Sequence, residues 1–250
     1  MLTKDSEPKY TNNKLYVPFC SKQNGITPIL NKHTEYILID NVLSPSECLY
    51  LRNLSNTTHF SRRKTQNRDK IIINSDSFTH IITERCQKYI PDYAHIDSDM
   101  EESYRYWDTP KINPNWRLVK CNPGSSIKPH LDSTLVESIN RRSIFTIMIY
   151  LSNNKDGATV IGKDQIFPKE GSVLIFNQNL LHSGNVNTEY KYFIRSEIIY
   201  NRETNIKDQK HLKAFEIYQQ AQQTSGNEAK ILEEKAFEMS PLLESMVYNY

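Results

Sequence analysis

Three residues of this chain have the types and the spacing of a metal site. His130 and Asp132 form a His-x-Asp pair, and His182 follows about fifty residues later. Two imidazoles and one carboxylate can bind non-haem Fe(II) on one face and leave the opposite positions open for reactants. Side chains two positions apart on an extended chain point the same way, so His130 and Asp132 can reach one ion. The pattern therefore predicts a non-haem iron oxygenase.

The surroundings of the pair carry more information than the pair itself, because composition alone produces His-x-Asp by chance. A second copy at 95–97 runs into polar residues with no apolar strand after it, and a solvated loop explains that copy better. The pair at 130–132 comes after the strand-like run WRLVKC (116–121) and before the apolar runs IFTIMIYL (144–151) and GSVLIFN (171–177). Such runs predict the strands that a metal site needs as a scaffold.

A second set of residues could hold a cosubstrate. The run KYFIRSEIIY (191–200) places Lys191 and Arg195 on one face of a predicted strand. Basic side chains on an inward face are costly unless they meet anions. We expect them to meet 2-oxoglutarate, which chelates iron at one end and carries a carboxylate at the other; an edge strand with its charges in water is the alternative. The hydroxyl of Tyr150 could bind the same carboxylate, or its ring could simply fill the core.

From about residue 35 to 202, the chain resembles the catalytic domain of prolyl 4-hydroxylase-type Fe(II)/2-oxoglutarate dioxygenases. The matching motifs are EYILIDNVLSPSEC (35–48), NRDKIIINSDSF (67–78), NPNWRLVKCNPGSSIKPHLD (113–132), RSIFTIMIYLSN (142–153) and FPKEGSVLIFNQNLLHSG through RSEIIYNR (167–202). The resemblance implies a double-stranded β-helix (jelly-roll) core in which His130, Asp132 and His182 hold Fe(II). It also implies that Lys191 binds the 5-carboxylate of 2-oxoglutarate, helped by Tyr150.

Two features depart from the family pattern. The loop after His182 reads SGNVNTEY, one residue shorter than in many relatives, so Lys191 and Arg195 could exchange roles. Where relatives often have an aromatic residue before the Pro-Gly turn, this chain has Lys120-Cys121-Asn122. We expect Cys121 to be a small buried hydrophobic residue.

The resemblance implies hydroxylation of a C–H bond, with Fe(II), O2 and 2-oxoglutarate required and ascorbate a candidate addition. The family's usual target is a prolyl residue in a protein or peptide, and we take this as the expected substrate. A free amino acid or another small molecule is the alternative. A catalytically inactive jelly roll that binds or scaffolds a partner is disfavoured by the intact metal-ligand pattern. A nucleic-acid demethylase of the same superfamily is disfavoured by the near-neutral charge and by the lack of a second arginine pair after Arg195.

The composition is that of a folded enzyme. The chain of 250 residues can bury a full core, and 10% aromatic residues argue against disorder. A formal net charge of +2 gives no overall field that would recruit nucleic acid or membrane. No run approaches the ~18 apolar residues of a membrane span, and the N-terminus has no signal-peptide core. The cysteines (Cys20, Cys48, Cys86 and Cys121) show no CxxC spacing, which indicates reduced thiols and a cytoplasmic location.

The chain divides into three predicted regions of an α+β protein. Residues 1–34 are polar and are expected to form a loose arm, and residues 35–203 are expected to form the dioxygenase domain. A capping box at 44–47 predicts a helix to about residue 54, and an apolar face predicts a second helix at 76–89. These helices would brace the outside of the sheet.

The third region, 204–250, is rich in helix formers and is expected to form a helical hairpin. Ala229, Ala236 and Pro241 have the spacing of the second helix of a tetratricopeptide unit. One unit cannot bury its own face, so the hairpin should pack on the catalytic domain or bind a partner. A brace on the catalytic domain is the favoured alternative.

A basic run, FSRRKTQNRDK (60–70), lies between the two predicted helices. Such charge runs are usually solvated loops. In the family that this chain resembles, the corresponding stretch often folds over the mouth of the active site. Arg62, Arg63 and Lys64 are therefore the candidate substrate-binding residues.

Overall fold

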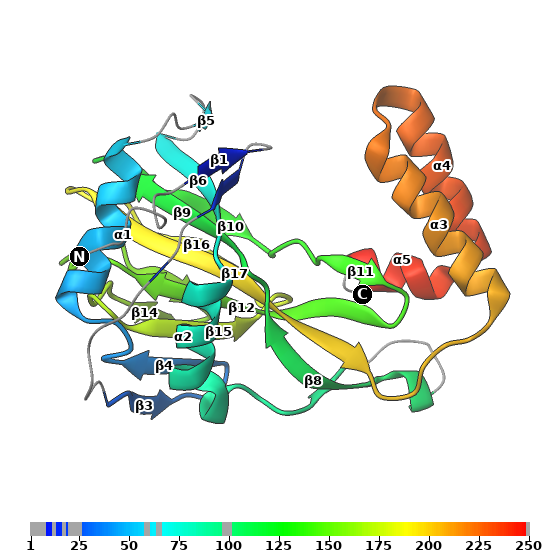
Figure 1. Ribbon diagram of the computed structural model, residues 1–250, viewed down its shortest axis with the longest axis horizontal. Coiled ribbons are helices and arrows are strands. Elements are labelled where there is room, and N and C mark those ends of the chain that lie inside the picture. The colour runs from blue at the N-terminus through cyan, green and yellow to red at the C-terminus, as the bar shows by residue number, and fades with distance from the viewer. Residues whose placement is uncertain are drawn as a thin grey trace. The chain divides into compact units, whose positions relative to one another are not determined.

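The fold is described by a computed structural model that covers residues 9–11, 14–16, 19, 27–57, 61–63, 67–96 and 102–248. Strands make up most of the structure before residue 203, and helices make up most of residues 204–248 (Figure 1). The order of the elements matches the expected α+β class. By contacts between residues, the chain forms two compact units: Met1–Ile90, Ile112–Asp132 and Phe145–Glu197 form the first, and Pro91–Lys111, Ser133–Ile144 and Ile198–Tyr250 form the second.

The larger sheet is built around four apolar strands. Its order is β1-β2-β6-β9-β17-β12-β15-β4-β3. The bounds of these strands are β1 Lys9–Thr11, β2 Lys14–Tyr16, β3 Ile29–Lys32, β4 Tyr36–Asp40, β6 Arg68–Asn74, β9 Asn115–Cys121, β12 Arg141–Tyr150, β15 Val173–Asn177 and β17 Lys191–Arg202. β5 (Ser61–Arg63) pairs with β6. The apolar runs at 116–121, 144–151, 171–177 and 191–200 all fall on strands, as their patterns predict.

The smaller sheet carries the histidines. Its order is β10-β16-β13-β14, with bounds Ile127–His130, His182–Gly184, Thr159–Ile161 and Asp164–Ile166. Apolar side chains of both sheets form one buried cluster: Tyr36, Val119, Cys121, Met148, Tyr150, Ile161, Ile166, Leu174, Phe176 and Phe193. Two antiparallel sheets that close on a shared core form the expected double-stranded β-helix.

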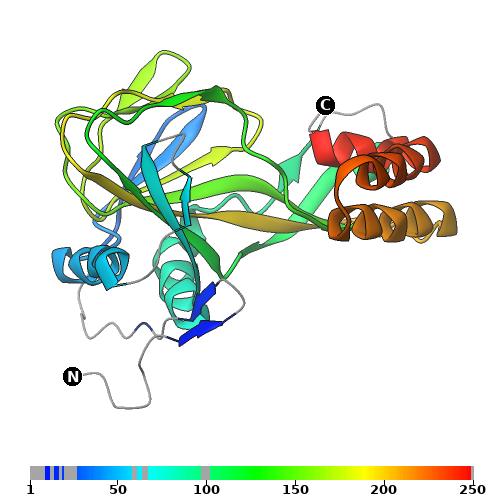
Figure 2. The same cartoon turned by 90° about the horizontal axis from the view of Figure 1, so that it is seen from above.

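Two helices brace the larger sheet. α1 (Pro45–Thr57) begins with the predicted capping box, in which Ser44 Oγ accepts from the backbone of Glu47 and Glu47 Oε2 accepts from the backbone of Ser44. α2 (Asp76–Cys86) begins after Ser75, whose side chain accepts from the backbone of Phe78, and continues into the 3-10 turn η3 (Gln87–Tyr89). Figure 2 shows α1 and α2 on the same side of the strands. Both predicted helices are confirmed.

The packing of Trp116 against α2 shows which face of β9 can contribute to the site. Its buried indole donates from Nε1 to Thr79 Oγ1 at 2.9 Å and packs edge-on against Phe78 of α2. Because neighbouring side chains on a strand point to opposite faces, Arg117 and Val119 point away from α2. That opposite face of β9 looks into the double-stranded β-helix.

The expectation of a loose arm at 1–34 is wrong for several of the described residues. Ile29–Lys32 form β3, which pairs antiparallel with β4, and β2 pairs parallel with β6. β3 lies at the end of the sheet order, where one side of the strand needs no partner, and its Ile29 and Leu30 are exposed. Two apolar residues within a polar segment were too few to indicate this edge strand.

The second unit contains the short elements β7 (Ala94–His95), η4 (Glu102–Tyr104) and β11 (Val136–Ser138), and all of β8 (Tyr106–Ile112) except Ile112. It also contains α3 (Gln209–Gln223) and α4 (Gly226–Met239), which form the predicted hairpin, and α5 (Pro241–Tyr248), which was not predicted. The buried guanidinium of Arg202 stacks on Trp107 at 4.1 Å and bonds Met246 of α5. No helix in the described part of the chain is long and apolar enough to cross a membrane.

Candidate metal centre

The register of two short strands brings the histidines together. β10 and β16 pair antiparallel with His130 directly opposite His182. Residues that face each other across an antiparallel pair project from the same side of the sheet. Their ring centroids lie 4.3 Å apart. A single strand pairing thus brings together two residues that are about fifty positions apart in the sequence.

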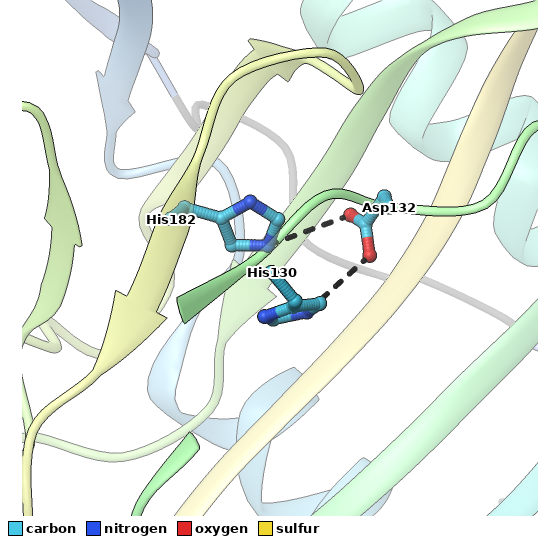
Figure 3. Close-up of side chains that lie close together, drawn as sticks. All are labelled: His130, Asp132 and His182. Atoms are coloured by element: carbon cyan, nitrogen blue, oxygen red, sulfur yellow. Dashed lines mark ion pairs between the residues drawn. The ribbon is translucent and has the colours of Figure 1, made fainter. Parts of the chain in front are cut away.

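Asp132 completes the group (Figure 3). It lies two residues beyond the end of β10, and its backbone N–H donates to Gln178 O at 3.2 Å. Its Oδ1 is 3.8 Å from Nε2 of His130, and its Oδ2 is 3.7 Å from Nε2 of His182. Ligand atoms about 2 Å from a common ion can be up to ~4 Å apart, so these separations suit one metal. The three residues are a potential metal-binding group among the described residues.

The backbone orients both imidazoles toward Asp132. Nδ1 of His130 lies 2.9 Å from Lys128 O, and Nδ1 of His182 lies 2.9 Å from Leu180 O. An Nδ1–H that donates to a carbonyl leaves the lone pair on Nε2, which is the arrangement of a metal-binding histidine. Burial lowers the pKa of His182, so its neutral, ligating form is favoured.

Two side chains hold the carboxylate of Asp132, which is 4% exposed. Arg195 of β17 donates to Oδ1, and Thr146 of β12 donates to Oδ2 at 2.7 Å. Burial alone would raise the pKa of Asp132, but the charge of Arg195 and the hydrogen bonds from Thr146 and Arg195 outweigh it and lower the pKa. Asp132 is therefore kept ionised, as a metal ligand must be.

Lys191 lies deeper, in apolar surroundings. It is 4% exposed, and its Nζ donates to Gly157 O at 2.6 Å and lies 5.7 Å from the ring centroids of Tyr150 and Phe193. Among the described residues, Lys191 forms no ion pair. Burial lowers its pKa to about 8. A buried ammonium that bonds a carbonyl is suited to receive an anion.

Tyr150 is close to Lys191 but is fully buried, and its hydroxyl donates to Thr159 Oγ1 at 2.7 Å. Burial raises the pKa of this phenol, which therefore stays protonated. Cys121 is buried, as expected, and burial raises the pKa of its thiol. The structure thus brings Tyr150 and Lys191 together, and it places the ring of Tyr150 in the core with its hydroxyl bonded to Thr159.

The other candidates that the structure describes belong to other strands than the two histidines. Arg62 and Arg63 belong to β5, opposite Asp69 and Arg68 of β6, and Lys64 lies outside the described residues. His95, from the second His-x-Asp copy, is exposed on β7 beside the ring of Tyr106, and Asp97 lies outside the described residues.

Reasoning from the sequence missed the role of Thr146. Neither its bond to Asp132 nor that of Arg195 was predicted. The only available signal was that Thr146 shares a strand face with Tyr150, and that face meets Asp132 only through the pairing of distant strands.

Residues 116–196 match the family described as the 2OG-Fe(II) oxygenase superfamily. The matched segment contains the two histidines, Asp132, Lys191 and Arg195. Over this segment the chain is similar to 2OG-Fe(II) oxygenases. Members of the family require Fe(II), 2-oxoglutarate and O2, and the donor set of two imidazoles and one carboxylate fits such an iron centre.

Solved structures resemble the chain in fold. The viral collagen prolyl hydroxylase vCPH from Paramecium Bursaria Chlorella virus-1, in its 2OG complex, is 19% identical with a TM-score of 0.51, and the match covers 66% of this chain and 96% of that one. HygX from Streptomyces hygroscopicus, with nickel and 2-oxoglutarate bound, is 13% identical with a TM-score of 0.49 over 68% of this chain and 84% of that one. No curated relative matches the chain in a sequence search.

Proposed function

We propose that this oxygenase hydroxylates a prolyl residue in a protein or peptide, with 2-oxoglutarate as cosubstrate. The observation that carries the proposal is the convergence of His130, Asp132 and His182 within the oxygenase domain. The choice of a prolyl target is supported by the sequence motifs shared with prolyl 4-hydroxylases. It is supported further by the fold likeness to vCPH, which is named as a collagen prolyl hydroxylase.

In this proposal, His130 and His182 bind Fe(II) through Nε2, and Asp132 binds it through its carboxylate. The iron, when bound, supplies the oxidising power for hydroxylation through O2 and the decarboxylation of 2-oxoglutarate. The protein holds the proposed metal ligands in position. The carbonyls of Lys128 and Leu180 fix the imidazoles, and Arg195 fixes the carboxylate together with Thr146.

Lys191 is the proposed anchor for the 5-carboxylate of 2-oxoglutarate. Its ammonium is buried and lies 5.7 Å from the ring centroid of Tyr150. Burial of both groups excludes water, which strengthens a charge–charge contact with the cosubstrate. Arg195 then remains with Asp132 and is a secondary candidate for the same anion.

The remaining assignments rest on position along the chain. Arg62, Arg63 and Lys64 are proposed to contact substrate at the mouth of the site. Residues 35–203 are proposed to be the catalytic part, and the helices of 204–250 are proposed to brace the second unit, in which α5 contributes buried residues.

The test is turnover by the purified full chain with Fe(II) and 2-oxoglutarate. A panel of proline-containing peptides, free amino acids and other small molecules is assayed for succinate release and for gain of one oxygen atom by mass spectrometry. Hydroxyproline in a peptide, absent with His182→Ala, is the expected result. Hydroxylation of free amino acids or small molecules alone would move the assignment to that class. No turnover of 2-oxoglutarate under any condition would leave an inactive binding protein.

A further inference from the structure

One face of three neighbouring strands in the first unit is unusually basic. β6, β9 and β17 pair side by side, with Arg68 opposite Cys121 and Cys121 opposite Lys191, and with Ile72 opposite Arg117 and Arg117 opposite Arg195. Residues opposite each other, and residues two apart on a strand, share a face. This face, which we call the basic face, carries Arg68, Lys70, Arg117, Lys191 and Arg195.

The basic face is the one that looks at the metal centre. Arg195 bonds Asp132 directly, whereas the opposite face of β9 is covered by α2 through Trp116. Lys191 is buried, but the side chains of Arg117 and Arg195 are 31% and 25% exposed, and Lys70 is exposed. The basic face therefore has exposed and partly exposed cations beside the buried ammonium of Lys191.

Within the described strands β6, β9 and β17, cations outnumber carboxylates on this face. Along the three strands, the alternate positions that form it carry five cations and one carboxylate, Glu197, which pairs with Arg117. Asp132 adds a second carboxylate, which pairs with Arg195. Fe(II) would add two positive charges and 2-oxoglutarate would add two negative charges. Binding of both would therefore leave the net charge unchanged.

The cations are close enough to affect one another. Burial, and after it the neighbouring charge of Arg195, lower the pKa of Arg117 to about 10. Burial also lowers the pKa of Arg68, and the charge of Arg195 acts on it in the same direction. Like charges held together in partly buried positions are stabilised when an anion binds among them.

We propose that the substrate is an acidic peptide, with a carboxylate side chain near the hydroxylated residue that binds the basic face at Arg68, Lys70 and Arg117. This inference rests on the proposed function and adds the charge of the substrate to it. A peptide carboxylate fits better than nucleic acid, because Arg68 and Arg117 are half-buried in a strand face. A phosphate backbone would need a row of exposed cations, and the chain's net charge is only +2.

The experiment measures binding, so that it does not depend on turnover. The full chain is loaded with redox-inert Zn(II) and 2-oxoglutarate. Fluorescence anisotropy then measures the binding of three labelled peptides, in which the same proline is flanked by Glu, by Gln or by Lys. We expect the Glu peptide to bind at least about tenfold tighter than the Gln peptide and the Lys peptide to bind most weakly. Added salt should weaken the Glu peptide selectively.

Variants show which residues cause the preference for the Glu peptide. Arg68→Gln combined with Lys70→Gln should reduce the preference for Glu over Gln to near unity and leave the Gln peptide unchanged. Arg68→Lys keeps the charge and should keep the preference, which separates charge from folding. Lys163→Gln, at an exposed turn between β13 and β14, is the matched control and should behave as the wild type.

The outcomes separate this inference from the proposed function. Equal binding of the Glu and Gln peptides, or no binding of any peptide, overturns the acidic substrate. So does a single-stranded oligonucleotide that binds tighter than the Glu peptide. If the Glu peptide binds through the basic face but the Fe(II)-loaded enzyme does not hydroxylate its proline, the acidic substrate stands and the prolyl target fails.

Discussion

The guanidinium of Arg195 donates a hydrogen bond to Oδ1 of Asp132, and the other oxygen of that carboxylate accepts from Thr146. Both oxygens of the proposed metal ligand are thus oriented by the larger sheet, although Asp132 itself comes just after a strand of the smaller one. Arg195 lies four residues from Lys191 on the same face of β17. One strand therefore carries the cation that bonds Asp132 and the cation proposed to bind the cosubstrate.

Because the two cations have different partners, we predict that replacing Lys191 and replacing Arg195 have different effects on binding. Lys191→Ala should weaken 2-oxoglutarate binding by about a hundredfold or more, because it leaves a buried anion without its partner. Arg195→Ala should weaken metal binding and kcat more than 2-oxoglutarate binding, since it releases Asp132. Titration of each variant with the metal and then with 2-oxoglutarate measures both. The opposite ranking for 2-oxoglutarate would make Arg195 the anchor.

The affinity for 2-oxoglutarate should depend on pH through Lys191. Burial lowers its pKa to about 8, and only the protonated ammonium attracts the carboxylate. The attraction is complete below that pKa and is lost as pH rises through it, so the apparent Kd should rise by nearly tenfold per pH unit above it. Lys191→Arg keeps its charge across this range and should flatten the profile. A flat wild-type profile would show that Lys191 does not hold the anion.

The metal ligands are tested by removing one at a time. His130→Ala or His182→Ala should abolish metal binding and succinate formation while the fold is retained, because each removes one of three protein ligands. Binding is measured by metal analysis after gel filtration, and the fold by circular dichroism. His95→Ala is the matched control, since His95 is exposed on β7. Normal metal content in either variant at the candidate centre would refute the assignment.

The sequence was sufficient to predict β9, β12, β15 and β17 of the larger sheet, because their apolar runs are long and regular, whereas β10 and β16, which carry the histidines, are short and lack such runs. The pairings between those strands were not predictable in the same way. Thr146 and Arg195 meet Asp132 only through the registers of β12 and β17, and no local pattern encodes a register between distant segments. Ile29–Lys32 were missed because a strand of four residues at the edge of a sheet is too short to show a regular pattern.

The basic run at 60–70 should affect binding of the substrate and not binding of 2-oxoglutarate. Replacing Arg62, Arg63 and Lys64 together with Ala should raise the substrate KM several-fold, because these residues are proposed to contact substrate at the mouth. The affinity for 2-oxoglutarate should stay unchanged, since Lys191 is untouched. Steady-state kinetics with each component varied in turn distinguish the two effects. An unchanged substrate KM would make the run an ordinary solvated surface.

The C-terminal helices should stabilise the second unit through α5. Its eight residues are too few to form a stable helix alone, so the helix depends on burying Leu242, Leu243 and Met246. Leu243 is fully buried, and Leu243→Ala should lower the free energy of unfolding by about 2–5 kcal/mol, because it leaves a cavity. Ile231→Ala on α4 is the matched control: its side chain is 55% exposed, so the change should be within about 0.5 kcal/mol. Urea unfolding of the full chain measures both. Equal stability of the two variants would show that α5 does not pack as a brace and would favour a surface that binds a partner.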